Sequence, residues 1–133
     1  MEAEYKAMFS EAQEFLSKKV IKEVRTICQG LTGDSEEHDL LTIAKREGYR
    51  TIIYAIGKDA ATDYSGVTLY VKTSSGEDLS PEGNGWNMEC FGSLERPAKL
   101  WLVIPRGQDI KIRYRSGSEV ALKARIEILY VKE

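Results

Sequence analysis

The chain has 133 residues, of which 42% are hydrophobic and 30% charged, and its formal net charge is −2. These values are typical of one globular domain with its own core, and they exclude a wholly disordered chain. The charge is uneven, because residues 1–98 hold 11 basic and 17 acidic side chains whereas residues 99–133 hold 8 and 4. This polarity is too mild to favour nucleic-acid binding.

Residues 1–33 are predicted to form a long amphipathic helix. Apolar side chains recur every three or four positions, and Gly30 and Gly33 provide a stop. The β-branched run Val20–Ile27 could instead form a first strand. A helix of this length would span roughly 40 Å, longer than a small sandwich is wide. We therefore expect residues 20–31 to pack on the domain's own sheet and the earlier part to contact another subunit, through Tyr5, Met8, Phe9, Ala12, Phe15 and Leu16.

Residues 34–133 are predicted to form an antiparallel β-sandwich, because apolar side chains now alternate with polar ones and turn residues follow at short intervals. The fold class is therefore mainly β and jelly-roll-like. Residues 73–87 form a loop in this prediction. The expected strands are 40–44, 50–57, 67–71, 86–91, 100–104, 110–115 and 120–130.

The last strand has the clearest alternation. Lys123, Arg125 and Glu127 are expected to point outward, away from the core. The alternate residues are expected to face the core: Val120, Leu122, Ala124, Ile126, Ile128 and Tyr130.

The two cysteines, Cys28 and Cys90, lack the spacing of a metal site. We expect two buried free thiols, although one disulfide between them remains open. The sequence near Met1 lacks the pattern of a signal peptide, and no apolar run reaches the roughly 20 residues needed to cross a bilayer. We therefore expect a chain made in a cytoplasm, with no membrane partner.

His38 is the single histidine and lies in an acidic turn with Asp34, Glu36, Glu37 and Asp39. It could act as a general base or share a cation with the carboxylates. A solvated turn is the favoured interpretation, because no second histidine and no spaced cysteines support a site. No nucleophile, phosphate-loop or dinucleotide motif occurs. The sequence therefore predicts a protein that is not an enzyme and uses no cofactor.

Two further groups of side chains could bind a ligand. The aromatic residues, with Trp86 the best candidate, could stack on a sugar, although strand aromatics more often belong to a core. Oxygen ligands for calcium could come from the loop, but they lack the spacing of a known calcium site. These ligands would be Glu77, Asp78, Glu82 and Asn84.

A basic patch is expected on two strands that a tight turn connects. It consists of Lys111, Arg113, Arg115, Lys123 and Arg125. It could bind an acidic partner or a phosphate backbone, and a solvated sheet face is the more common explanation.

Two segments resemble small β-sandwich virion proteins of tailed phages. Residues 40–71 resemble the opening of such proteins, which ends in a strand of the type Val67-Thr-Leu-Tyr-Val71. Residues 100–114 resemble their Ile-Pro-x-Gly turn, here Ile104-Pro-Arg-Gly107, and the strand that follows it. The resemblance covers about 90 of the 133 residues. It departs from the family at Lys45–Gly48, which replaces a Pro-Ala-Gly turn, and in the predicted N-terminal helix.

The resemblance implies a non-enzymatic structural protein of a virion: a capsid-decorating, capsid or tail component that forms homo-oligomers and contacts other virion proteins. The alternative is a carbohydrate-binding β-sandwich module. Exposed, coplanar aromatic rings on one sheet face or loop would favour the alternative.

Overall fold

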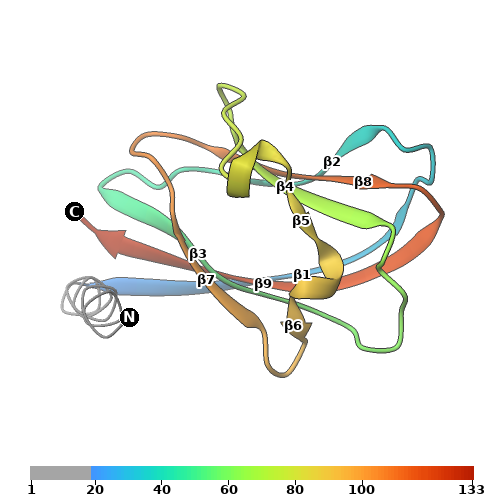
Figure 1. Ribbon diagram of the computed structural model, residues 1–133. Coiled ribbons are helices and arrows are strands. Elements are labelled where there is room, and N and C mark those ends of the chain that lie inside the picture. Colours follow the sequence, from blue (N-terminus) through green and yellow to red (C-terminus); the bar gives the residue numbers. More distant parts are fainter. Residues whose placement is uncertain (1–18) are drawn as a thin grey trace, which may run out of the picture.

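The computed structural model describes residues 19–133, and these form a sandwich of two packed β-sheets (Figure 1). The five-stranded sheet has the order β1-β9-β3-β6, with β7 also paired to β3. Its strands are β1 (Val20–Leu31), β3 (Tyr49–Lys58), β6 (Gly92–Ser93), β7 (Ala98–Val103) and β9 (Val120–Lys132). The four-stranded sheet has the order β2-β8-β4-β5. Its strands are β2 (Glu37–Ile43), β4 (Val67–Thr73), β5 (Trp86–Asn87) and β8 (Ile110–Ser116).

Pairing is antiparallel throughout, except for the short parallel contact between β3 and β6. Two 3₁₀ turns, η1 (Pro81–Gly83) and η2 (Met88–Cys90), lie on either side of β5. The prediction of a mainly β sandwich is therefore confirmed. The segment 86–91, predicted as one strand, is a two-residue strand followed by η2.

The predicted N-terminal helix is wrong over Val20–Leu31, which forms strand β1. β1 pairs with β9 along its whole length, from Val20 opposite Val131 to Leu31 opposite Val120. The alternative, a first strand in the β-branched run, is confirmed. β-Branched side chains fit a pleated sheet better than a helix, and the long-range pairing with β9 adds hydrogen bonds that no local pattern reveals. Residues 20–31 are therefore part of the sheet rather than packed on it.

Residues 1–18 lie outside the described part of the chain. The predicted assembly interface lies among them and is not placed: Tyr5, Met8, Phe9, Ala12, Phe15 and Leu16.

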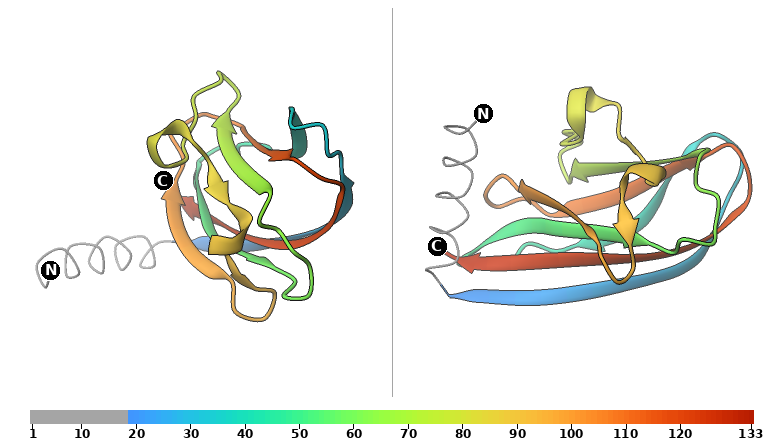
Figure 2. Two further views of the ribbon diagram at one scale, coloured as in Figure 1. Left: turned by 45° about the vertical axis from the view of Figure 1, so that its right-hand side comes forward. Right: turned by 60° about the horizontal axis from the view of Figure 1, so that its bottom comes forward.

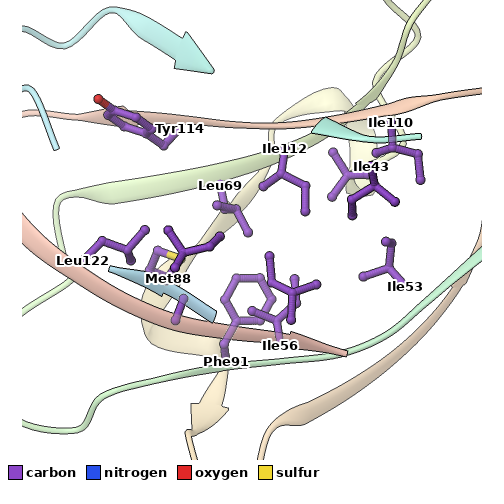
Figure 3. Close-up of a cluster of buried hydrophobic side chains, with 14 of the residues drawn as sticks. Ile43, Ile53, Ile56, Leu69, Met88, Phe91, Ile110, Ile112, Tyr114 and Leu122 are labelled. Carbon is purple, nitrogen blue, oxygen red and sulfur yellow. The ribbon is translucent and has the colours of Figure 1, made fainter. Parts of the chain in front are cut away.

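The main core lies between the sheets, where side chains from both point toward one another (Figure 3). Ile53 and Ile56 come from β3, Leu69 from β4 and Ile112 from β8, and each is at most 2% exposed. Burying one such side chain contributes roughly 1.5–3 kcal/mol. This packing of two apolar faces is what holds the sheets together.

The predicted alternation in β9 is confirmed on its inner face, where five of the six residues are buried: Leu122, Ala124, Ile126, Ile128 and Tyr130. Val120, the sixth, is half-buried. On the opposite face Lys123 is exposed, Arg125 is half-buried and Glu127 is only 6% exposed, so all three point away from the core although Glu127 is covered. Glu127 is covered because Lys22 Nζ lies 2.7 Å and Arg125 Nε 3.4 Å from its carboxylate.

The loop that crosses from β3 to β4 is held by Tyr64, which is fully buried. Its hydroxyl donates to Asp59 Oδ1 and accepts the backbone N–H of Lys123 at 3.0 Å. Thr62 Oγ1 also donates to Asp59, at 2.7 Å. These donors lower the pKa of Asp59, the Tyr64 hydroxyl most strongly, and burial together with Asp59 raises the pKa of Tyr64.

Two glycines allow close packing around β6, Gly57 against β6 itself and Gly92 against the turn that leads to β7. A Cβ on Gly57 would lie 2.3 Å from the carbonyl oxygen of Ser93, and one on Gly92 would lie 2.1 Å from that of Arg96. No larger residue fits at either position without a backbone shift, so the β3–β6 contact depends on Gly57 and the following turn on Gly92.

Candidate assembly surface

A second apolar cluster lies on the outer face of the five-stranded sheet, away from the main core. Ile52, Leu129 and Val131 are buried within it. Partly buried side chains pack around these three: Val20, Tyr54, Trp101 and Val103. We call these seven residues the outer cluster.

The outer cluster is assembled from four neighbouring strands. Ile52 on β3 lies opposite Leu129 on β9 and opposite Val103 on β7. The register of β3 shifts between Ile53 and Ala55, where a bulge interrupts its pairing with both neighbours. Bulges redirect side chains on a strand. This one accompanies a change of face, because Ile53 and Ile56 both point into the main core.

Trp101 has an unusual backbone conformation, with φ at 50° in the left-handed region. Such a conformation costs roughly 1–3 kcal/mol in a non-glycine residue and persists only where the surroundings favour it. Here the indole packs on Tyr54, with ring centroids 4.6 Å apart and planes at 86°. The edge-to-face contact offsets part of the backbone strain.

Positive charges border the outer cluster. The ammonium groups of Lys22 and Lys99 lie 5.8 Å and 5.7 Å from the centre of the Tyr54 ring. Both distances suit a cation–π interaction. Lys22 is also paired with Glu127, whereas Lys99 is exposed. The surface is therefore apolar with a partly cationic border.

Sequence reasoning did not single out the outer cluster, although the signal is present. The run Ile128-Leu129-Tyr130-Val131 breaks the alternation of β9, and β3 likewise has apolar residues on both faces. An antiparallel strand that is apolar on both faces is expected to be covered on both, by other parts of the chain or by another chain.

The predicted basic patch is divided between two faces. Lys111, Arg113 and Arg115 lie on β8, in the four-stranded sheet, whereas Lys123 and Arg125 lie on β9, in the five-stranded sheet. The turn between β8 and β9 is short, but it carries the chain from one sheet to the other instead of forming a hairpin within one sheet. The five side chains do not make one patch.

The outer face of the four-stranded sheet carries a charge network. Lys72 Nζ lies 2.7 Å from Glu37 Oε1, and Arg113 Nε lies 3.3 Å from Asp39 Oδ1. Lys72 lies directly opposite Lys111, so two like charges are neighbours across the strands. Most of these ion pairs are partly solvated and contribute little to stability.

His38 contacts one carboxylate, because its Nε2 lies 2.9 Å from both oxygens of Asp34. Its ring also lies 5.4 Å from that of Tyr114. The N–H of Glu36 and the His38 ring lower the pKa of Asp34. Within residues 19–133, no group of three or more His, Cys, Asp or Glu side chains could hold a metal ion.

The acidic loop has no shared ligand geometry in this structure. Asp78 accepts the N–H and the hydroxyl of Ser80 and so stabilises its own turn. Glu77, Glu82 and Asn84 are exposed.

The aromatic side chains are used mainly in packing. Trp86 is half-buried and lies 6.2 Å from the Phe91 ring, and Tyr64 and Tyr114 are buried. Tyr54 and Trp101 share a sheet face, but their rings are perpendicular and so do not offer the coplanar platform that sugar stacking requires.

Both cysteines are free and exposed. The expectation of buried thiols is wrong, because Cys28 lies on the rim strand β1 and Cys90 in the turn η2 rather than in the core.

No protein-family model and no curated protein matches the chain. In the part of the chain that the structure describes, no helix is long and apolar enough to span a membrane.

Proposed function

We propose that this chain is a non-enzymatic structural subunit of a virion, a capsid-decorating, capsid or tail component that assembles with copies of itself and with other virion proteins. The outer cluster carries the proposal. A lone sandwich needs one core between its sheets, yet this chain has a second apolar cluster on an outer face, and its members Val20, Tyr54, Trp101 and Val103 are only partly buried by the chain itself. Partly exposed apolar side chains that are grouped on one face suit a contact with another chain.

The strand order supports a jelly roll, the sandwich that is common in viral capsid proteins. Successive strands alternate between the two sheets from β1 to β4, and again from β7 to β9. β1-β9-β3-β7 then faces β2-β8-β4-β5, which is the order of two interleaved Greek keys. The resemblance of residues 40–71 and 100–114 to phage virion proteins points the same way.

The occupant that we propose for the outer cluster is the segment 5–16 of a neighbouring subunit. That segment supplies apolar side chains at spacings of three and four, and Glu11 and Glu14 lie among them. Their carboxylates complement Lys99 and Lys22 at the border of the outer cluster.

Sedimentation velocity of the full chain over a wide concentration range tests this proposal. We expect a large assembly, and Trp101→Glu should abolish it because a carboxylate would enter the apolar contact. Lys111→Glu on the charged face is the matched control and should leave the assembly intact. Deletion of residues 1–17 should leave a folded sandwich, by circular dichroism, that no longer forms the large assembly.

Location in a particle is tested in the native source. Purified particles should contain the chain in stoichiometric amounts by mass spectrometry, and antibody labelling should place it on a capsid or tail. A chain that is absent from particles and monomeric at high concentration would contradict the proposal.

A further inference from the structure

The two sheets have four edges, and three of them carry features that hinder pairing with another strand. β5 is only two residues long. β2 is interrupted by a register shift between Asp39 and Leu41. β7 follows Pro97 and contains Trp101 in its left-handed conformation. Short strands, bulges and proline are the usual means by which proteins prevent sheet edges from joining.

β1 forms the fourth edge, and it differs from the other three. It runs for 12 residues, its register with β9 has no shift, and its other side pairs with no described strand (Figure 2, right). Val24 lies near its middle and is, among the residues described, the one large hydrophobic side chain that is exposed, at 41%. A long, regular edge of this kind is a template for pairing with another chain.

The charges on β1 indicate which chain can pair with it. Glu23 and Arg25 flank Val24 on the same side of the strand, and they are hydrogen-bonded to each other. Charges on an edge strand normally oppose pairing, because a foreign strand would leave them without partners. Antiparallel pairing of β1 with a second β1 has the opposite result, since the two charges have opposite signs and are symmetric about Val24.

We propose that two copies of this chain pair through their β1 strands, antiparallel and centred on Val24, so that one sheet continues across both copies. In this register Val24 lies opposite Val24 of the second copy, and Glu23 lies opposite Arg25 of the second copy. Ile21 lies opposite Ile27, which extends the inner apolar layer. The contact is self-complementary and closes as a two-fold dimer.

This dimer is one contact within the assembly proposed above, and it rests on that proposal only in taking the chain to self-associate. It uses the edge of the sheet, whereas the segment 5–16 is proposed to use the outer face. The two contacts can therefore fail independently.

Disulfide trapping tests the register. In the full chain with Cys28→Ser and Cys90→Ser, we expect Val24→Cys to give a cross-linked dimer under mild oxidation, because opposed residues lie within the roughly 4.4–6.8 Å that a disulfide spans. Thr26→Cys is the matched control. The two copies of position 26 would be about 14 Å apart along the strands, four residues at about 3.4 Å each, so we expect no cross-link.

A charge exchange tests the choice of partner. Arg25→Glu places like charges opposite each other at two positions, and we expect it to weaken the dimer by at least roughly tenfold. The double variant Glu23→Arg, Arg25→Glu restores both pairs and should bring the dissociation constant back to within about threefold of the starting value. Circular dichroism of each variant checks that the sandwich is intact.

The outcomes separate the two proposals. A large assembly without a Val24→Cys cross-link, or with equal cross-linking at position 26, would overturn the β1 dimer and leave the proposed function standing. A specific cross-link and rescue by the double variant, without a large assembly, would support the dimer and overturn the proposed function.

Discussion

The two outer faces of this sandwich have opposite chemistry, although both belong to sheets that share one core. The face of the five-stranded sheet carries the outer cluster, in which Ile52 and Val131 are at most 1% exposed. The face of the four-stranded sheet carries Lys72 and Arg113 in partly solvated ion pairs, and the exposed Lys111 beside them. The charged face is in contact with solvent, whereas the outer cluster is a second apolar core whose outermost side chains, Val20, Tyr54, Trp101 and Val103, are only partly buried by the chain itself. This difference is why we propose the outer cluster, and not the charged face, as the contact surface.

The largest expected effect is loss of the core that both sheets share, because neither outer face exists without it. Ile126→Asp places a carboxylate without a partner at a position that is 1% exposed. We expect the domain to unfold, because an unpaired buried charge costs more than the few kcal/mol by which such domains are stable. Circular dichroism and hydrogen exchange would show the loss. A cooperative thermal transition in this variant would contradict the assignment of β9 to the core.

The second test asks whether the outer cluster behaves like a core. Leu129 is 7% exposed on the outer face, so Leu129→Ala should lower the free energy of unfolding by about 2–4 kcal/mol. Lys111→Ala on the opposite outer face is the control and should change it by less than about 0.5 kcal/mol. Urea denaturation measures both. Equal values for the two variants would remove the distinction between the faces.

The third test concerns the connection between the two sheets, where Asp59 receives hydrogen bonds from Tyr64 and Thr62. The pKa of Asp59 is lowered below 3.8 in the folded state, so its stabilising contribution is present above that pH and is lost as the pH falls through the folded pKa. The Tm of the wild type should therefore exceed that of Asp59→Asn at pH 6 and converge with it in acid. A constant difference at all pH values would exclude this titration as the cause.

At alkaline pH the dependence of stability on pH has the opposite sign. The pKa of Tyr64 is raised above 10.0, so the folded state favours the neutral phenol, and this contribution is lost as the pH rises above about 10. The difference in absorbance at 295 nm between the wild type and Tyr64→Phe, recorded for the folded and the unfolded protein, would locate the titration of Tyr64 in each state.

The smallest expected effect belongs to the charged face. Lys111 lies opposite Lys72, so Lys111→Glu replaces a repulsive cross-strand pair by an attractive one. We expect a gain of about 0.2–1 kcal/mol at low salt, decreasing as salt is added. Denaturation at two salt concentrations measures it. A loss of stability would contradict the assignment of Lys72 and Lys111 as a repulsive pair.

Local patterns predicted those parts of the fold in which one face is buried and the other is solvated. The alternation in β8 and most of β9 placed those strands, because a period of two has only one buried face. The residues of β1 were predicted to be helical because their apolar spacings also fit a helix. Their preference for a strand, which comes from the β-branched side chains, determines the structure only because β9 lies beside them. The alternation in β9 likewise does not reveal that Glu127 is covered on the outer face, because its cover comes from Lys22, about a hundred residues earlier in the chain.

The candidate site depended even more on information that is not local. Ile52, Leu129 and Trp101 come from three strands, and nothing in any one of them reveals that they meet on one outer face. The prediction of one basic patch was wrong for the converse reason: residues that are close in sequence lie apart in the fold. Arg115 and Lys123 belong to different sheets. Whether a short turn joins neighbours in a sheet or connects two layers is decided by tertiary packing.

The two ends of the described chain lie together, since Val20 is opposite Val131 and the N–H of Lys132 donates to the carbonyl of Lys19 at 2.9 Å. A stretching force applied through these ends acts on the same end of the β1–β9 pair. Its hydrogen bonds then break one after another, as in unzipping, rather than together, as they would in shear. A single subunit should therefore unravel from β1 at low tension. A neighbour bound along the free side of β1 would share that load, so mechanical strength would belong to the assembled protein rather than to the isolated domain.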